Sequence, residues 1–272
     1  MNFKRLDRRY LHLLLIAVTV FPLLKPMGLP ISIGVHSRTL YDYIQHLPPG
    51  SVVLNVFDWG PAQIPDAGVG AMAITQHLLS LPVKIVAFSQ EVSAVMMYEY
   101  TMSRIKIPPD KKYGTDFVYF GFIAGLETAL AAIAKDVHAT FVKDYYGTPV
   151  EQIPMMDKIR TVKDFALVVE TTNTGTHVDG FLRQWKSPYG TPIAINIGAV
   201  MVPTYLPYYP GQVLAVIAGA RGGSEYELLI KQPGPGVASL DAVSTSHLLV
   251  IIFIAIGNIQ YFIEKRKRRE ER

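Results

Sequence analysis

Carboxylate, amide, imidazole and hydroxyl side chains follow three apolar runs of the chain, where such groups can bind a polar ligand or move a proton. Asp58 follows the run 51–57, and Gln90 and Glu91 follow the run 83–88. The segment after the run 165–171 is the most polar of the three. A carboxylate and an imidazole suit acid–base chemistry, whereas amides and hydroxyls suit ligand recognition. The candidate ligand-binding residues are Asp58, Gln90, Glu91, Asn173, Thr174, Gly175 and His177.

These residues also have structural interpretations. Asp58 can cap the turn after its strand, and Glu91 suits the first turn of a helix, because the helix dipole favours a carboxylate there. His177 can simply be exposed on its loop. The segment TTNTGT at 171–176 can cradle a phosphate with its amides and hydroxyls. The sequence nevertheless lacks G-x-x-x-x-G-K-[ST] and G-x-G-x-x-G, so no motif supports nucleotide binding.

Several kinds of chemistry lack the residues that they require. The chain has no cysteine, which excludes disulfides, a thiolate nucleophile, a zinc–thiolate site and iron–sulfur clusters. The motifs G-x-S-x-G and H-E-x-x-H are also absent. We expect no metal site and no cofactor, because the histidines of the central region lack the spacing of metal ligands. These histidines are His36, His46, His77, His138 and His177.

A run of prolines and tyrosines at 203–212, PTYLPYYPGQ, suits an interface with a partner. Tyr205, Tyr208 and Tyr209 each combine an apolar ring with a polar tip, which favours tyrosine at protein and lipid interfaces. The alternative is a stiff connection between the fifth strand and the following helix.

Two further sets of residues are interface candidates. Arg221 and Glu225 are four residues apart, so they can pair on one face of a helix or orient a partner. Asn258 lies beside Gly257 in an apolar segment. An unpaired amide is costly in lipid, so this pair predicts a contact with another helix.

The apolar runs that precede the polar residues predict a parallel sheet. They are continuous rather than alternating, which is typical of strands buried on both faces. Helical segments separate them, and this repeated spacing predicts one α/β domain with a doubly wound, mostly parallel sheet of about five strands. In such a sheet the carboxyl ends of the strands open a crevice, where we place the ligand site. The expected strands are 51–57, 83–88, 116–122, 165–171 and 192–200, and the expected helices are 36–47, 66–81, 91–106, 125–142, 178–186 and 211–230.

Apolar segments with basic outer ends flank this domain. Residues 10–26 and 244–263 are predicted as transmembrane helices. The tails 1–9 and 264–272 each carry a net charge of +3, which leaves about −2 for the rest of a chain of net charge +4. Basic residues resist translocation, so we expect both tails in the cytoplasm and the domain at 30–242 outside it. The first segment can alternatively be a cleaved signal. With its charge in the tails, the chain is not expected to bind nucleic acid.

Two classes of function are compatible with these features. The favoured class is a membrane-anchored, non-catalytic subunit of a larger membrane assembly, whose extracytoplasmic domain binds protein partners or a small ligand. Its expected partners are the lipid bilayer and either other membrane-protein subunits or further copies of itself. The alternative is a membrane-tethered hydrolase or transferase that uses Asp58, Glu91 or His177. Catalysis requires these side chains to converge on one point.

Overall fold

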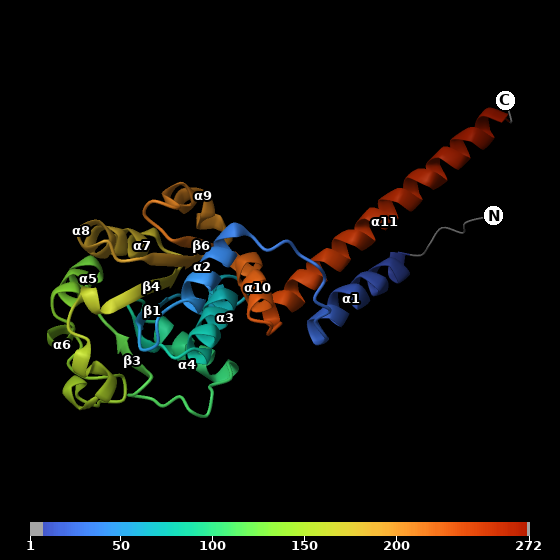
Figure 1. The fold of residues 1–272 in the computed structure, drawn as a ribbon. Coiled ribbons are helices and arrows are strands. Elements are labelled where there is room, and N and C mark those ends of the chain that lie inside the picture. The colour runs from blue at the N-terminus through green and yellow to red at the C-terminus, as the bar shows by residue number, and fades with distance from the viewer. Residues whose placement is uncertain (1–7, 271–272) are drawn as a thin grey trace. The chain divides into compact units, whose positions relative to one another are not determined.

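The computed structural model describes residues 8–270 and divides into two compact units (Figure 1). Residues Ile31–Gln232 form one unit, here called the α/β unit. The segment ending at Pro30 and the segment beginning at Pro233 form the other, here called the helical unit. Most of the basic tail predicted at 1–9 lies outside the described residues.

The α/β unit is built on one six-stranded sheet in which every pair of neighbouring strands is parallel. The strand order is β3-β2-β1-β4-β5-β6, so the chain starts at the centre, moves outward to one edge and then returns to the centre. This order confirms the α/β class and the parallel sheet, with six strands rather than about five. The strands are β1 (Val52–Asp58), β2 (Lys84–Ser89), β3 (Phe117–Phe122), β4 (Phe165–Thr172), β5 (Ile193–Ile197) and β6 (Ala215–Ala218).

Helices cover both faces of the sheet (Figure 1). On the face here called the α3 face, the core contains side chains from α2, α3, α4 and α10. On the other face, here called the α7 face, it contains side chains from α5, α6 and α7. The helices of the α/β unit are α2 (Val35–Gln45), α3 (Ala67–Ser80), α4 (Ala94–Arg104), α5 (Leu126–Lys135), α6 (Val137–Thr140), α7 (Gly175–Phe181), α8 (Ser187–Tyr189), α9 (Val202–Tyr205) and α10 (Gly219–Leu229), with a π-helical turn at Leu182–Lys186.

The helix predicted at 211–230 is wrong in its first half, which forms β6. A short apolar run between turn residues fits a buried strand and a buried helix equally well, so its periodicity could not decide between them. The strand ends at Ala218, and the next residue, Gly219, has a φ of +55° in the left-handed region. A Cβ at this position would clash with Asp66 Oδ1, so the turn into α10 requires glycine.

The helical unit contains α1 (Arg8–Leu24) and α11 (Pro235–Glu270). The two helices are in contact, because Thr245 Oγ1 donates to the carbonyl of Val18 at 2.8 Å and the hydroxyls of Thr19 and Ser246 lie 2.8 Å apart. Among the described helices, only Pro235–Ile263 is long and apolar enough to cross a membrane.

The N-terminal span predicted at 10–26 is not supported. Helix α1 has 17 residues and ends at Leu24. At a rise of 1.5 Å per residue it is about 25 Å long, less than the roughly 30 Å of a hydrocarbon core. The predicted span continued to residue 26, past the apolar residues that end at Leu24.

In each unit, a buried carboxylate joins two segments that are far apart in the sequence. In the α/β unit, Glu225 accepts hydrogen bonds from the backbone amide of Gly34 at 3.0 Å and the hydroxyl of Ser37 at 2.7 Å. In the helical unit, Asp241 accepts from three consecutive backbone amides at 2.7 to 3.0 Å, those of Met27, Gly28 and Leu29. Such charge-assisted bonds are among the stronger hydrogen bonds in proteins.

Candidate functional site

A cleft of about 320 Å³ lies at the carboxyl ends of the central strands. Strand β1 runs parallel to both β2 and β4. The chain adds β2 and β3 on one side of β1, and then β4, β5 and β6 on the other side, so the strand order reverses at β1. Ligands of open α/β sheets bind at such a switch point. The polar side chains that line the cleft are Asp58, Gln63, Glu91, Ser93, Asn173 and Thr174.

Asp58 is the last residue of β1 and is only 3 % exposed. Its Oδ1 atom accepts from the backbone amide of Gln90 and from the hydroxyl of Ser89 at 3.2 Å. Its Oδ2 atom has no hydrogen-bond partner and lies 3.7 Å from Nδ1 of His177. Burial raises the pKa of Asp58, although the nearby His177 opposes this effect. Asp58 is therefore held in place through Oδ1, while Oδ2 has no hydrogen-bond partner among the described residues.

Glu170 lies beside Asp58 although the sequence analysis did not select it. In the β1–β4 register, Val56 pairs with Glu170 and Asp58 pairs with Thr172. Residues two apart in a strand share a face, so both carboxyls lie on the α7 face. The signal for Glu170 was a single carboxylate inside the buried run FALVVETT. Glutamate is seldom fully buried unless it is paired, so a glutamate inside a strand buried on both faces indicates a specific role.

Glu170 has an unusual environment. It is fully buried, and neither of its oxygens has a hydrogen-bond partner while the carboxyl is ionised. Burial raises the pKa of Glu170 well above its usual value, and the charge of Asp58 adds to this effect. A proton on Glu170 would allow it to donate to Asp58.

His177 completes the cluster. It lies in the first turn of α7 and is 5 % exposed, so the interpretation that it is exposed on a loop is wrong. Nδ1 of His177 lies 3.0 Å from Oγ1 of Thr172. One ligand atom each from Asp58, Glu170 and His177 lies within 4.8 Å of the other two. We call these three residues the buried trio.

Glu91 and Gln90 have different surroundings. Glu91 lines the cleft and accepts from the hydroxyl of Ser93 at 3.0 Å, just before α4 begins. The Gln90 side chain is buried and donates to the carbonyl of Leu126 at 2.7 Å. Gln90 is not among the residues that line the cleft, so its contribution to this edge is mainly the backbone amide bound to Asp58.

The polar loop after β4 has both exposed and structural residues. Thr174 is exposed and lines the cleft. Asn173 also lines it, and its Oδ1 accepts from the amide of Gly198 at 2.7 Å, which ties this loop to the end of β5. A Cβ at Gly175 would lie 2.8 Å from Oη of Tyr205. Gly175 therefore permits close packing and offers no side chain to a ligand.

The structure corrects the interface interpretation of Tyr205. This residue is 3 % exposed, and its hydroxyl donates to Asp179 at 3.0 Å and to the carbonyl of Gly175 at 3.1 Å. Tyr208 and Tyr209 are partly buried and pack against the core of the α7 face. Tyr205 therefore belongs to the fold, whereas the interface role of Tyr208 and Tyr209 stays a prediction.

The other interface candidates have mixed outcomes. Arg221 and Glu225 form the expected pair, with Nε 3.1 Å from Oε1 in α10. Glu225 is buried and also bonded to the start of α2, so the pair belongs to the fold. Asn258 is exposed on α11, and its contact with another helix remains a prediction.

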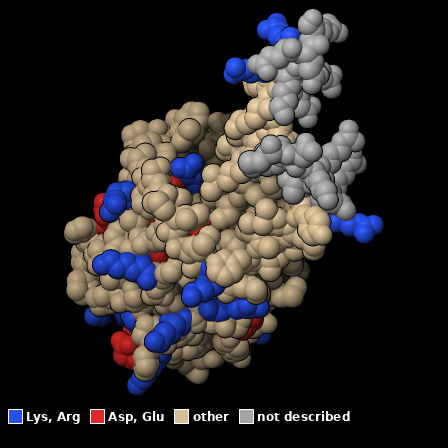
Figure 2. Space-filling view, turned by 90° about the vertical axis from the view of Figure 1, so that its right-hand side faces the viewer, with Lys and Arg blue, Asp and Glu red and all other residues tan. Residues whose placement is uncertain are grey.

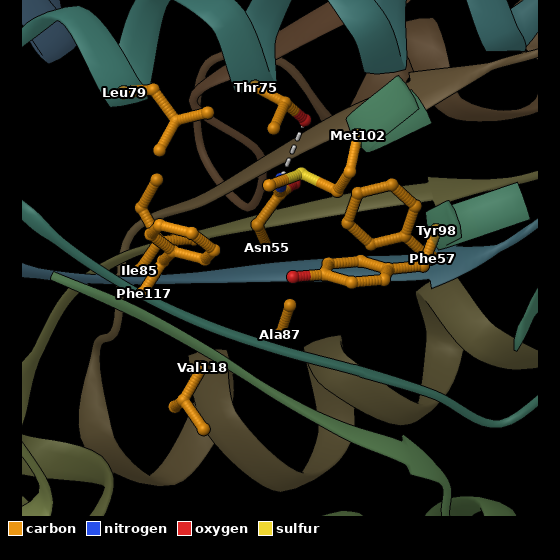
Figure 3. Close-up of a pocket in the computed structure, with 10 residues that line it drawn as sticks. All are labelled: Asn55, Phe57, Thr75, Leu79, Ile85, Ala87, Tyr98, Met102, Phe117 and Val118. Atoms are coloured by element: carbon orange, nitrogen blue, oxygen red, sulfur yellow. Dashed lines mark hydrogen bonds between the residues drawn. The ribbon is translucent and has the colours of Figure 1, made fainter. Parts of the chain in front are cut away.

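A second, internal cavity lies between α3, α4 and the strands β1, β2 and β3 (Figure 3). Its volume is about 10 Å³, at most enough for one water molecule. Figure 3 shows the hydrogen bond from Asn55 to Thr75, 2.9 Å long, beside apolar side chains that enclose the gap. This cavity is too small for a ligand. Another open pocket, of about 350 Å³ beside Tyr208 and Gln212, has no charged lining residue, so the cleft with its two carboxyl groups is the candidate site.

The face shown in Figure 2 carries Lys and Arg side chains in several separate groups, with uncharged surface between them.

Comparison of the chain with protein families, characterised proteins and solved structures gave no significant match. The site is therefore interpreted from its own geometry.

Proposed function

We propose that this protein is a membrane-anchored, non-catalytic subunit whose α/β unit binds a small polar ligand in the cleft. The observation that carries this proposal is the position of the cleft at the switch point between β1 and its two neighbours, with six polar side chains along it. Concave sites with a few convergent polar groups are typical of small-molecule binding.

The charges of the cleft narrow the class of ligand. Two carboxylates, Asp58 and Glu91, line it, and none of its lining residues is a lysine or an arginine. An anionic ligand would meet these carboxylates without a compensating cation. A neutral polyol or a small amine can instead donate hydrogen bonds to Asp58, Glu91 and Asn173. We propose a ligand of this neutral or cationic class.

The anchor is proposed to cross the bilayer through α11, with α1 alongside it as a second, shorter segment. Two hydrogen bonds join α1 to α11, which supports their insertion as a pair. The basic residues after Ile263 favour a cytoplasmic position for that end, and a crossing by α11 then places the α/β unit on the opposite side. Asn258 is exposed within the span, and its amide supports association with another subunit or a second copy.

Acid–base catalysis is the second candidate, favoured by the short separation of Asp58 and His177. Their side chains converge to 3.7 Å, as a hydrolase or transferase would require. A nucleophile is harder to assign. Thr172 is the hydroxyl nearest to the imidazole, at 3.0 Å, but it is fully buried on β4. Binding therefore explains the cleft with fewer requirements than covalent catalysis does.

Native mass spectrometry of the detergent-purified chain tests the proposal. We expect masses well above the 30.2 kDa of one chain, from partner subunits or further copies, and a small-molecule increment on each chain. Thr174→Trp, which fills the cleft, should abolish the increment. Thr176→Trp is the matched control, because Thr176 is exposed in the first turn of α7, two residues after Thr174, but does not line the cleft. A clean monomer without an increment would contradict the proposal, and equal loss in both variants would contradict the site.

A further inference from the structure

We infer that the buried trio, Asp58, Glu170 and His177, binds one divalent transition-metal cation of the zinc class beneath the cleft. The inference goes beyond the proposed function. Because Asp58 belongs to both sites, the ligand class proposed above applies to the chain without a bound cation. It reverses the expectation of no metal site, which rested on the spacing of histidines along the sequence. The trio instead comes from three elements, β1, β4 and α7, that only the fold brings together.

The donor atoms match such a cation. Zinc binds carboxylate oxygens and imidazole nitrogens at about 2.0–2.2 Å, so donors around one ion lie roughly 3–4 Å apart. Oδ2 of Asp58 and Nδ1 of His177 are 3.7 Å apart. The third donor, from Glu170, keeps all separations within 4.8 Å. On binding an ion, the longest of these separations would have to shorten by roughly 1 Å to reach that range.

The unpartnered oxygens are the second, independent observation. Oδ2 of Asp58 and both oxygens of Glu170 are buried, and no described residue donates a hydrogen bond to them. Buried polar atoms are nearly always hydrogen-bonded, and buried charges are paired or coordinate a metal. No lysine or arginine forms an ion pair with either carboxylate within the described part of the chain. A divalent cation supplies the missing positive charge.

Neighbouring residues orient two of the donors. Ser89 and the amide of Gln90 hold Oδ1 of Asp58, which directs Oδ2 towards His177. Thr172 Oγ1 lies 3.0 Å from Nδ1 of His177 and 3.4 Å from the carbonyl of Thr174. The hydroxyl proton of Thr172 can therefore be donated to the carbonyl of Thr174 when Nδ1 of His177 binds a cation. Supporting contacts of this kind are usual around metal ligands.

Asp58 also lines the cleft, which connects the trio to solvent. With three protein donors, a zinc-class cation retains at least one position for water or another ligand. A cation at the trio would therefore be reached from the cleft.

A proton shared between Glu170 and Asp58 is the competing explanation for the same burial. Zinc titration of the full-length chain in detergent, after treatment with a chelator, distinguishes the two. The informative variant is Glu170→Gln, which keeps the shape and hydrogen-bonding capacity of the side chain but removes the charge. Glu91→Gln is the matched control, because Glu91 lines the same cleft outside the trio.

We expect one zinc ion per wild-type chain by calorimetry and elemental analysis, at least tenfold weaker binding in Glu170→Gln, and unchanged binding in Glu91→Gln. Should Glu170→Gln fold poorly, His177→Gln provides the same test. The thermal unfolding midpoint gives a second readout, since zinc should raise it in the wild type and in Glu91→Gln only. Absence of zinc binding by the wild type, or equal binding by Glu170→Gln, would overturn the inference. The small-molecule increment is measured separately without zinc, so failure of one proposal leaves the other testable.

Discussion

The two faces of the sheet contain buried polar residues of opposite character. On the α3 face, the amide nitrogen of Asn55 donates to Thr75 at 2.9 Å, and that of Asn196 donates to the carbonyl of Ala67 at 2.7 Å, although Oδ1 of Asn196 has no described partner. On the α7 face, Asp58 and Glu170 hold three buried oxygens that no described residue satisfies. Neutral amides bonded to their neighbours stabilise a fold, whereas unpaired carboxylates cost stability. The comparison indicates that the α7 face retains its polar residues for a ligand.

The largest expected effect is a loss of folding stability at acid pH, caused by the protonation of His77 on the α3 face. This histidine is buried between Tyr226, at 2.8 Å from Nδ1, and Gln45, at 3.1 Å from Nε2. Burial lowers the pKa of His77 from 6.5 to about 4. The unfolded chain therefore binds the proton first, and stability falls as the pH drops from about 6.5 to about 4, by up to about 3 kcal/mol.

Chemical unfolding in detergent measures this effect. Fluorescence reports on the α/β unit alone, because both tryptophans of the chain, Trp59 and Trp185, are buried in it. His77→Gln should flatten the pH profile, whereas His46→Gln, at an exposed histidine, should leave it unchanged. The raised pKa of Glu170 acts in the opposite direction over this range, so the comparison of variants is decisive, and identical profiles for the wild type and His77→Gln would refute the prediction.

A smaller loss is expected from Asn196→Ala on the same face. The substitution removes the donor to Ala67 and to Thr171 and leaves the buried carbonyl of Ala67 without this partner. We expect a loss of about 2 kcal/mol in the free energy of unfolding. A Cβ at Gly70 would clash with Oδ1 of Asn196. Gly70→Ala should therefore be destabilising alone but less so together with Asn196→Ala, and additive effects would show that this contact is unimportant.

The opposite sign is expected on the α7 face. Glu170→Gln removes an ionisable group whose burial costs free energy, either as a buried charge or as the proton that the carboxyl must take up on folding. In metal-free protein near neutral pH it should therefore stabilise the fold by about 1 kcal/mol. Glu91→Gln again serves as the control. A loss of stability comparable to that of Asn196→Ala would mean that the two faces do not differ in the way described above.

The smallest effect is expected from Arg221→Ala. Arg221 is exposed, so its pair with Glu225 contributes less than about 0.5 kcal/mol. Glu225→Ala should cost more, because it also frees the amide of Gly34 and the hydroxyl of Ser37. Equal losses from the two substitutions would assign the whole contribution to the ion pair.

The sequence predicted those parts of the fold that depend only on which segments are buried. Continuous apolar runs predicted the parallel sheet, and the strand ends then indicated the edge at which Asp58, Glu91, Asn173 and Thr174 line one cleft. Glu170 was missed because it lies inside a strand rather than after one. Its importance depends on the register that places Asp58 beside it.

Other errors arose where neighbours in space decide the outcome. Tyr205 is typical of an interface by composition, but α7 provides partners for its hydroxyl and the core takes its ring. The run that forms β6 is long enough for either a strand or a short helix, and pairing with β5 decides for the strand. Neither the contact of Tyr205 nor the pairing of β6 is encoded in local spacing.

The hydrogen bonds of Glu225 have a mechanical consequence. They join Gly34 and Ser37, near the point where the chain enters the α/β unit, to α10, the last helix before the chain leaves it. Tension applied between the two ends of this unit therefore acts first across these short contacts. The route of the force does not pass through the central strands, so a pull on the ends is carried away from the edge where the cleft lies.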